Sequence, residues 1–413
     1  MWKKGSASRP HHHLKRRSQS RRRRLLSLLL LWVLQSLYVV AMTNHLLVLS
    51  TGQHVGKTTL SLGLVKTLQA KFQGTNKLVA YCKPVGQQHV PVGDNLRVDK
   101  DAYLFKEHFG LIQHYKDMSP VIFPDGFTRD FIDGKVTSQQ LMDSIRAAHR
   151  NLYDQSDFVI CEGTGHTGVG SICELNNAQV AAELKIDAVC VALGGLGSSF
   201  DQLAMNREML KQNNVRLRGV VLNKVNPKKM DMIQDYYSRA LKRWDVPLVG
   251  CIPDLKDLSC PTMADYAKLL KSDLISGKDA SLRYFSSTRL ALAPVDGTNL
   301  FKAIPNQLVI THSGRKDVID AIIGNQEASS SHGTNLKSGL ILTGWNPPTA
   351  WLAQRLDADN IPCIYVSPDK ADSYTITARI AQFTAKIRRE DVERIDLAAD
   401  HVSKHCDFSF LEG

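Results

Sequence analysis

Residues 45–60 read HLLVLSTGQHVGKTTL, and this stretch decides the fold. The apolar run 45–50 predicts a buried strand, and residues 57–71 carry apolar side chains at helical spacing. Between them, Gly52 and Gly56 bracket a short turn that ends in Gly-Lys-Thr-Thr. A strand, a glycine-bearing turn and a helix in this order are the context that a phosphate-binding loop requires.

The residue types in this turn suit a nucleoside triphosphate. Glycines let backbone N–H groups turn inward around phosphate oxygens, and the N-terminus of the following helix adds its positive dipole. A lysine can reach the β- and γ-phosphates, one threonine can ligate Mg²⁺, and the next can bond the α-phosphate. We therefore expect ATP and Mg²⁺ to bind Gly52, Gln53, His54, Val55, Gly56, Lys57, Thr58 and Thr59.

The strict spacing GxxxxGK[ST] is not met, since Thr51 stands where the first glycine would be. The alternative is an ordinary glycine turn that caps a helix. Gly-Lys-Thr-Thr at the junction argues against that alternative.

Two further candidates follow apolar strands. Glu162 ends the strand 157–161, and its carboxylate could hold Mg²⁺ at the carboxyl edge of a sheet. A solvated strand-end acid is the alternative, which the following Gly-Thr-Gly-His makes less favoured. Lys83 follows the strand 78–81 and could stabilise charge during phosphoryl transfer, as Lys57 could. On sequence alone a surface lysine is the better interpretation of Lys83.

For two further candidate site residues, a binding role and a purely structural role are equally plausible from the sequence. Asp101 opens a predicted helix, where it could be a second Mg²⁺ ligand or simply an acid favoured by the helix dipole. Asn223 ends the strand 219–222, where its amide could read the edge of adenine or could only form a turn.

The rest of the chain predicts an α/β protein in two blocks. In residues 42–270, near-continuous apolar strands alternate with helices, which predicts a parallel sheet with helices on both faces. Residues 271–305 are expected to be a linker, residues 306–400 a smaller α/β domain, and residues 401–413 a tail. In the smaller domain, the polar stretch 325–337 is expected to be a mobile loop.

The positive charge is concentrated at the N-terminus. The formal net charge is +12, and residues 1–24 hold ten Lys or Arg and no acid, which leaves +2 for the remainder. The body therefore lacks the basic stripe of a nucleic-acid-binding protein, and we expect no nucleic-acid partner. The eight cysteines include no CxxC pair and fit buried free thiols better than disulfides or zinc ligands.

An apolar run, 25–42, follows the basic segment. Three interpretations remain open: a signal peptide or signal anchor, an organelle transit peptide, or an overlong gene model whose true start is Met42. The third is slightly favoured, because Met42 stands just before the first strand. A membrane is expected as a partner only if 25–42 is a real anchor, and the cytoplasm or an organelle interior is the favoured location.

A set of short motifs carries a family resemblance: Thr51-Gly52, Val55-Gly56-Lys57-Thr58, Lys83-Pro84-Val85, Asp101-Ala102, Glu162-Gly163, Asn223-Lys224-Val225 and Gly250-Cys251-Ile252-Pro253. With these, residues 45–270 resemble the dethiobiotin synthetase-like branch of P-loop proteins. That branch includes the N-terminal region of long bacterial phosphate acetyltransferases. The resemblance implies ATP in the site, Lys57 on its phosphates, Thr58, Asp101 and Glu162 around magnesium, Asn223 on adenine, and Lys83 facing the reacting group.

Residues 306–400 resemble the small α/β domain called DRTGG, which lies mid-chain in those acetyltransferases. The resemblance rests on Leu308-Val309-Ile310-Thr311, Asp317-Val318-Ile319, Leu342-Thr343-Gly344 and the segment 372–378. The Asp-Arg pair of that family appears here as Gly314-Arg315.

Two functions follow. The first is a regulatory or sensor ATPase without acetyltransferase activity of its own, favoured because the sequence ends where the acetyltransferases continue into their catalytic domain. The second is an ATP-dependent ligase that phosphorylates a small-molecule carboxylate for attack by an amine. We expect a homo-oligomer, with the carboxylate or a regulatory ligand as an unidentified partner.

Overall fold

The computed structural model describes residues 44–412, apart from 94, 293–303 and 384. The basic leader and the apolar run 25–42 lie outside the described residues. Among those that are described, no helix has the length and apolar character needed to cross a membrane.

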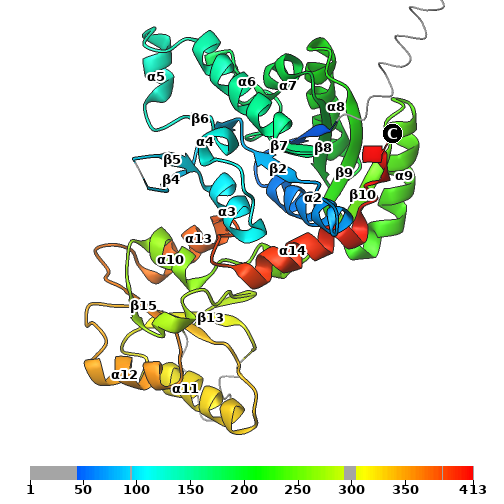
Figure 1. Ribbon diagram of the computed structural model, residues 1–413. Coiled ribbons are helices and arrows are strands. Elements are labelled where there is room, and N and C mark those ends of the chain that lie inside the picture. Colours follow the sequence, from blue (N-terminus) through cyan, green and yellow to red (C-terminus); the bar gives the residue numbers. More distant parts are fainter. Residues whose placement is uncertain (1–43, 94, 293–303, 384, 413) are drawn as a thin grey trace, which may run out of the picture. The chain divides into compact units, whose positions relative to one another are not determined.

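The first sheet has six strands in the order β10-β9-β8-β1-β7-β2, and all neighbours are parallel. The strands are β1 (His45–Ser50), β2 (Val79–Cys82), β7 (Phe158–Glu162), β8 (Asp187–Leu193), β9 (Leu217–Val225) and β10 (Leu248–Pro253). Helices flank this sheet, as expected for the α/β class (Figure 1). They include α2 (Lys57–Phe72), α3 (Lys100–Phe109), α6 (Ser138–Asp154), α7 (Asn177–Leu184), α8 (Gly197–Gln212) and α9 (Met230–Lys242).

The strand order explains where a ligand would bind. From β1 the chain first builds β2 and β7 on one side, and then β8, β9 and β10 on the other. The loop at the end of β1 therefore lies at a topological switch point, where such sheets bind ligands. Leu46, Leu47, Val48 and Leu49 of β1 are buried on both faces, so this central strand is a rigid support for the loop.

The second sheet has the order β11-β15-β14-β13-β12, with β11 antiparallel to its neighbour and the other pairs parallel. Its strands are β11 (Leu274–Ser276), β12 (Ser287–Leu290), β13 (Gln307–His312), β14 (Gly339–Thr343) and β15 (Cys363–Val366). Its helices are α10 (Met263–Leu270), α11 (Lys316–Ser331), α12 (Ala350–Ala358) and α13 (Ser373–Gln382). We call residues 263–382 the second block, since α10 and α13 share one apolar core with this sheet.

The structure differs from the sequence expectation at two places in this block. β11 and β12 fall inside 271–305, the stretch expected to be a linker, and form the two edges of the sheet. Helix α11 continues to Ser331, into the stretch 325–337 that was expected to be a mobile loop. Gln326 accounts for this difference, because it is buried and its amide donates to Asn335 Oδ1 at 3.0 Å.

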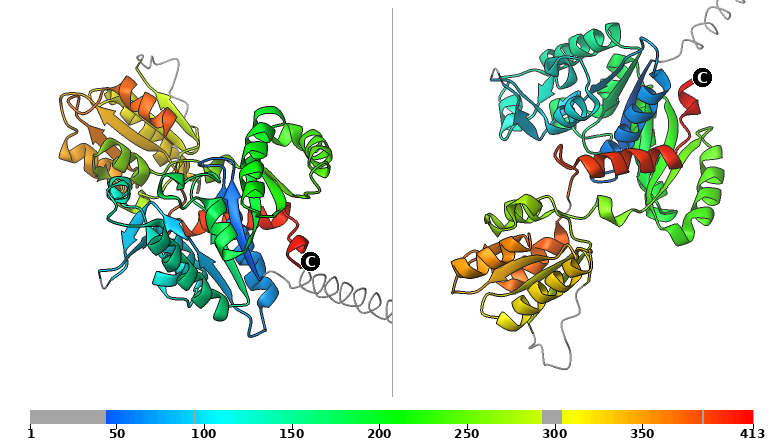
Figure 2. Two further views of the ribbon diagram at one scale, coloured as in Figure 1. Left: turned by 90° about the horizontal axis from the view of Figure 1, so that it is seen from above. Right: turned by 60° about the horizontal axis from the view of Figure 1, so that its bottom comes forward.

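After the second block the chain returns to the first sheet. Helix α14 (Val392–His405) packs along α2 (Figures 1 and 2). The contact is close because α2 has Gly63 there: an added Cβ would lie 2.3 Å from Val402 Cγ1. Lys66 of α2 also pairs with Asp400 at 2.8 Å. Residues 392–400 were expected to belong to the smaller domain, but in the structure they pack on α2. The sequence could not show this, because the apolar face of a helix does not specify which surface it covers.

All eight cysteines lie in the described part of the chain and are free thiols, seven of them buried. This agrees with the free thiols expected from the sequence.

Candidate functional site

The turn between β1 and α2 has the backbone shape of an anion-binding loop. His54 and Gly56 have φ values of 58° and 118°, both in the left-handed region. Two features require glycine at position 56. Its φ is unfavourable for other residues, and Asn223 Nδ2 would lie 2.0 Å from an added Cβ. Gly56 also precedes α2 without offering a side-chain cap, so the N–H groups of the first turn are left to another acceptor.

Two residues at the end of β9 brace this loop. Asn223 Nδ2 donates to the carbonyl of Val55 at 2.8 Å, and Lys224 Nζ donates to the carbonyl of His54 at 3.0 Å. Both side chains line the pocket described below. The amide of Asn223, predicted to read adenine, thus has a structural role on the loop, and any contact with a base would be additional.

Lys57 is buried beneath the loop among neutral partners. Its Nζ donates to Ser50 Oγ at 2.8 Å and to the carbonyl of Gly165 at 2.7 Å. Burial lowers the pKa of Lys57 to about 8, an effect that Glu162 partly counteracts and that Lys83 reinforces. The ammonium is therefore held in place but not neutralised, which is the state that an incoming phosphate would stabilise.

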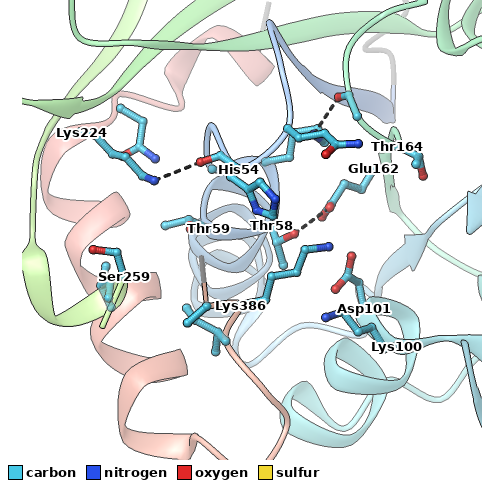
Figure 3. A pocket seen from close by; sticks show the side chains of 18 of the residues that line it. His54, Thr58, Thr59, Lys100, Asp101, Glu162, Thr164, Lys224, Ser259 and Lys386 are labelled. Atoms are coloured by element: carbon cyan, nitrogen blue, oxygen red, sulfur yellow. Dashed lines mark hydrogen bonds between the residues drawn. The ribbon is translucent and has the colours of Figure 1, made fainter. Parts of the chain in front are cut away.

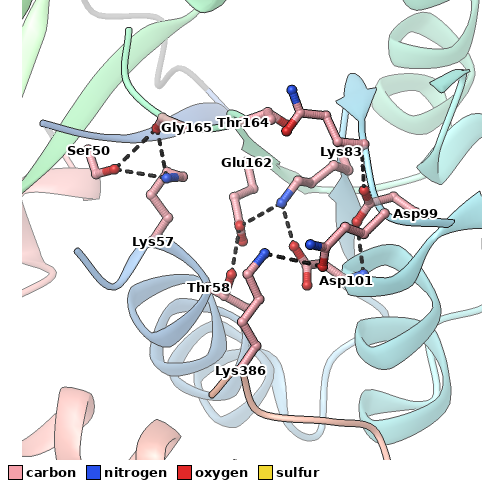
Figure 4. A network of polar contacts seen from close by, with 12 residues as sticks. Ser50, Lys57, Thr58, Lys83, Asp99, Asp101, Glu162, Thr164, Gly165 and Lys386 are labelled. Atoms are coloured by element: carbon pink, nitrogen blue, oxygen red, sulfur yellow. Dashed lines mark hydrogen bonds and ion pairs between the residues drawn. The ribbon is translucent and has the colours of Figure 1, made fainter. Parts of the chain in front are cut away.

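Glu162 is fully buried at the end of β7 and joins three elements. Its Oε1 accepts hydrogen bonds from Thr58 Oγ1 at 2.8 Å and from Lys83 Nζ at 3.0 Å. Its Oε2 accepts from Tyr81 Oη at 3.0 Å. The first turn of α2 and the ends of β2 and β7 are thereby tied together (Figure 4).

Lys83 is not a surface lysine, although the sequence favoured that interpretation. It is buried, and its Nζ lies 2.5 Å from Asp101 Oδ2 and 3.0 Å from Glu162 Oε1. Burial opposes the charge, but the two carboxylates outweigh it and hold the pKa of Lys83 above its ordinary value. Burial would likewise raise the pKa of Asp101, yet Lys83 and further lysines lower it to about 2. Lys83 and Asp101 are thus both ionised at neutral pH.

The start of α3 positions Asp101. Asp99 caps this helix, since its Oδ1 accepts from the backbone N–H of Asp101 at 2.9 Å. Burial raises the pKa of Asp99 to about 6, partly offset by Lys83. Asp101 therefore lies in the first turn of α3, where the helix dipole favours an acid, and it lines the pocket; its role as a Mg²⁺ ligand stays a prediction.

A cavity of about 230 Å³ opens over these groups (Figure 3). It is lined by the loop and by Lys83, Asp101, Glu162 and Asn223, which the sequence analysis had singled out. Its wall also includes residues that were not predicted to be site residues: Gln87, Gln88, Lys100, Thr164, Gly165, residues 253–255, Leu258, Ser259, residues 385–387 and His401. Lys100 adjoins a candidate acid and could have been found from the sequence, whereas the residues beyond 380 carry no local signal.

The donor atoms in this cavity suit a hard cation. Thr58 supplies a hydroxyl, and Asp101 and Glu162 supply carboxylate oxygens, the ligand types that Mg²⁺ prefers together with water and phosphate. Within the described residues, no group of three or more His, Cys, Asp or Glu forms a complete protein metal site. The arrangement therefore fits a cation that arrives with a phosphate better than one held by protein alone.

Comparisons with known proteins match the part of the chain that carries this site. Residues 44–262 match the family profile AAA_26, described as an AAA domain. The phosphate acetyltransferase of Nitrosomonas europaea is 25% identical over 366 residues, which cover 87% of this chain and 50% of the relative. That of Nitratidesulfovibrio vulgaris is 26% identical over 376 residues, covering 90% of this chain and 51% of the relative. The chain thus spans about half the length of the curated relatives it matches.

Among solved structures, the MinC:MinD cell division protein complex of Aquifex aeolicus gives a TM-score of 0.33 at 14% identity. The match covers 52% of this chain and 83% of that chain.

Proposed function

The chain belongs to the AAA_26 family of AAA domains, and on this premise we propose that it is a regulatory ATPase that binds ATP with Mg²⁺. In this proposal the loop amides and Lys57 hold the phosphates, and Thr58, Asp101 and Glu162 surround the cation. When bound, Mg²⁺ would neutralise phosphate charge. The second block, with its DRTGG-like motifs, would sense a ligand or partner.

The observation that supports a regulatory role is the path of the chain between α13 and α14. We call residues 385–391 the strap. Ala385, Lys386 and Ile387 of the strap line the same cavity as the phosphate-binding loop. A segment that leaves the second block therefore forms part of the nucleotide pocket, so the occupancy of the pocket can bias that block.

The ion pairs of Lys83 with Asp101 and Glu162 support a second candidate function, that of an ATP-dependent ligase. Lys83 is buried and charged beside Thr58 and the two acids, at the place where a transferred phosphoryl group would carry negative charge. A small-molecule carboxylate would then be phosphorylated and attacked by an amine. Acetyltransferase activity is not proposed for this chain.

The test is nucleotide binding and turnover by the full chain. We expect MgATP to bind the native chain in isothermal titration and Lys57→Ala to lose that binding. Lys71→Ala, an exposed lysine in the last turn of the same helix, is the control and should bind normally. ATP affinity unchanged by Lys57→Ala would refute the phosphate-loop assignment.

Phosphate release separates the two candidates. A regulatory ATPase should hydrolyse ATP slowly without any added metabolite, or bind it without turnover. A ligase should release phosphate only when a carboxylate and an amine substrate are both supplied, and a screen of metabolites by thermal shift would find such substrates.

A further inference from the structure

Lys386 is a cation that the second block contributes to the pocket. The strap carries it more than 300 residues from the phosphate-binding loop, yet its side chain reaches toward the side of the pocket that holds Thr58 and Asp101 (Figures 3 and 4). Within the described residues, its Nζ donates a single hydrogen bond, a long one of 3.5 Å to Gln88 Oε1. The side chain is exposed, so it is free to move to a better acceptor.

The lysines around the pocket carry positive charge that a bound polyanion could balance. Lys83 is already matched by Asp101 and Glu162. In the part of the chain that the structure describes, Lys57, Lys100 and Lys386 form no ion pair with a carboxylate, although all three line the cavity. Burial and the charge of Lys386 lower the pKa of Lys100 to about 8, although Asp101 and Asp99 act in the opposite direction.

Lys57 and Lys386 reach the pocket from different elements, α2 and the strap. The loop amides at the N-terminus of α2 would hold the phosphate chain, and Lys57 lies where the lysine of such loops reaches the β- and γ-phosphates. Lys386 comes from the strap, and its side chain lies on the side of the pocket with the candidate cation ligands Thr58 and Asp101. A terminal phosphate that shares a cation with Thr58 and Asp101 would lie on the side of Lys386, and a diphosphate lacks that group.

We propose that Lys386 contacts the terminal phosphate of bound ATP, so that the strap distinguishes a nucleoside triphosphate from a diphosphate and reports the difference to the second block. This inference rests on the proposed function. It assigns Lys386 as a specificity residue supplied by the segment that connects the second block to α14.

The contacts of the strap could transmit the state of the nucleotide to the second block. Arg388 pairs with Asp265 of α10, in the second block. Arg389 Nη1 donates to Tyr103 Oη at 2.6 Å, and its guanidinium lies 4.8 Å from the centre of that ring. Tyr103 belongs to α3, the helix that begins with Lys100 and Asp101. A shift of Lys386 toward a phosphate would therefore act on anchors in both parts of the chain.

The test compares the affinities of the full chain for Mg-AMP-PNP and MgADP by isothermal titration. Lys386→Ala should weaken Mg-AMP-PNP binding by roughly ten- to a hundredfold, the usual worth of a charged hydrogen bond, and leave MgADP affinity unchanged. Lys386→Arg should retain most of the preference. Lys404→Ala, an exposed lysine on α14 outside the cavity wall, is the matched control.

Hydrogen exchange of the native chain supplies the second readout. Mg-AMP-PNP should protect the strap amides more than MgADP does, and Lys386→Ala should remove that difference. An unchanged ratio of the two affinities in Lys386→Ala would overturn the inference while leaving the proposed function intact. A native chain that binds neither nucleotide would instead refute the proposed function, and the inference with it.

Discussion

Raising the pH from 7 to 9.5 should weaken MgATP binding about thirtyfold, because Lys57 loses its proton over this range. The partners of its ammonium, Ser50 Oγ and the Gly165 carbonyl, are neutral and lie at 2.8 and 2.7 Å. They orient the group without stabilising its charge as a carboxylate would. Burial therefore dominates and lowers the pKa to about 8.

The magnitude follows from this pKa. At pH 7 about nine-tenths of the Lys57 side chains are charged in the free protein. At pH 9.5, 1.5 pH units above the pKa, restoring the proton costs about 2 kcal/mol, which is about thirtyfold in affinity. Lys83 stays charged throughout, because Asp101 and Glu162 outweigh its burial and raise its pKa.

Unfolding linked to Lys57 cannot produce the same loss. The pKa of Lys57 is about 8 in the folded chain and near 10.5 in the unfolded chain, so the unfolded state binds more protons between these values. The contribution of Lys57 to the free energy of unfolding therefore rises with pH over this range, the opposite direction to the binding effect.

The assay is isothermal titration of MgATP at pH 7 and pH 9.5, with a further titration at pH 9 in two buffers of different ionisation enthalpy. Burial also lowers the pKa of Lys100 to about 8, so Lys100→Met is used to isolate the effect of Lys57. In this variant, binding at pH 9 should take up close to one proton, by the titration of a single group with a pKa of about 8. Equal affinity at both pH values with no proton uptake would show that the Lys57 ammonium does not meet the phosphates.

Two further predictions concern the supports of the site. Glu162→Gln should lower Mg²⁺-dependent ATP affinity about tenfold while the circular dichroism spectrum stays native, because the amide keeps the shape of the side chain but not its charge; an unchanged magnesium dependence would contradict this role. Gly63→Ala should lower the free energy of unfolding by about 1–3 kcal/mol, because its Cβ would lie 2.3 Å from Val402 Cγ1. Adding Val402→Ala should recover most of that loss in thermal unfolding, and an equal loss in both backgrounds would show that α14 does not pack on α2 at Gly63.

The sequence by itself determined the parts of the molecule whose cause is local. The strand 45–50 coincides with β1, and the helix expected over 57–71 is α2 over Lys57–Phe72, because the apolar pattern and the glycines that direct the turn are neighbours along the chain. The order of the strands also placed Glu162 near the loop, since the carboxyl ends of parallel strands meet at one edge.

Only the tertiary structure decided how these groups are used. A lysine after a strand looks the same whether it faces water or two buried carboxylates, so the ion pairs of Lys83 could not be foreseen. The amide of Asn223 had two interpretations from the sequence, an adenine contact or a turn, and the fold brings it to the carbonyl of Val55. Both outcomes depend on which strands become neighbours in the sheet.

The sequence carried no signal for the surface on which α14 packs. The apolar face of α14 predicts that the helix is buried, but only packing on Gly63 of α2 shows against which surface. That packing draws the strap across the pocket and places Lys386 among its cations. Periodicity specifies which side of an element is apolar, whereas its partner is selected by the shape and charge of surfaces hundreds of residues away.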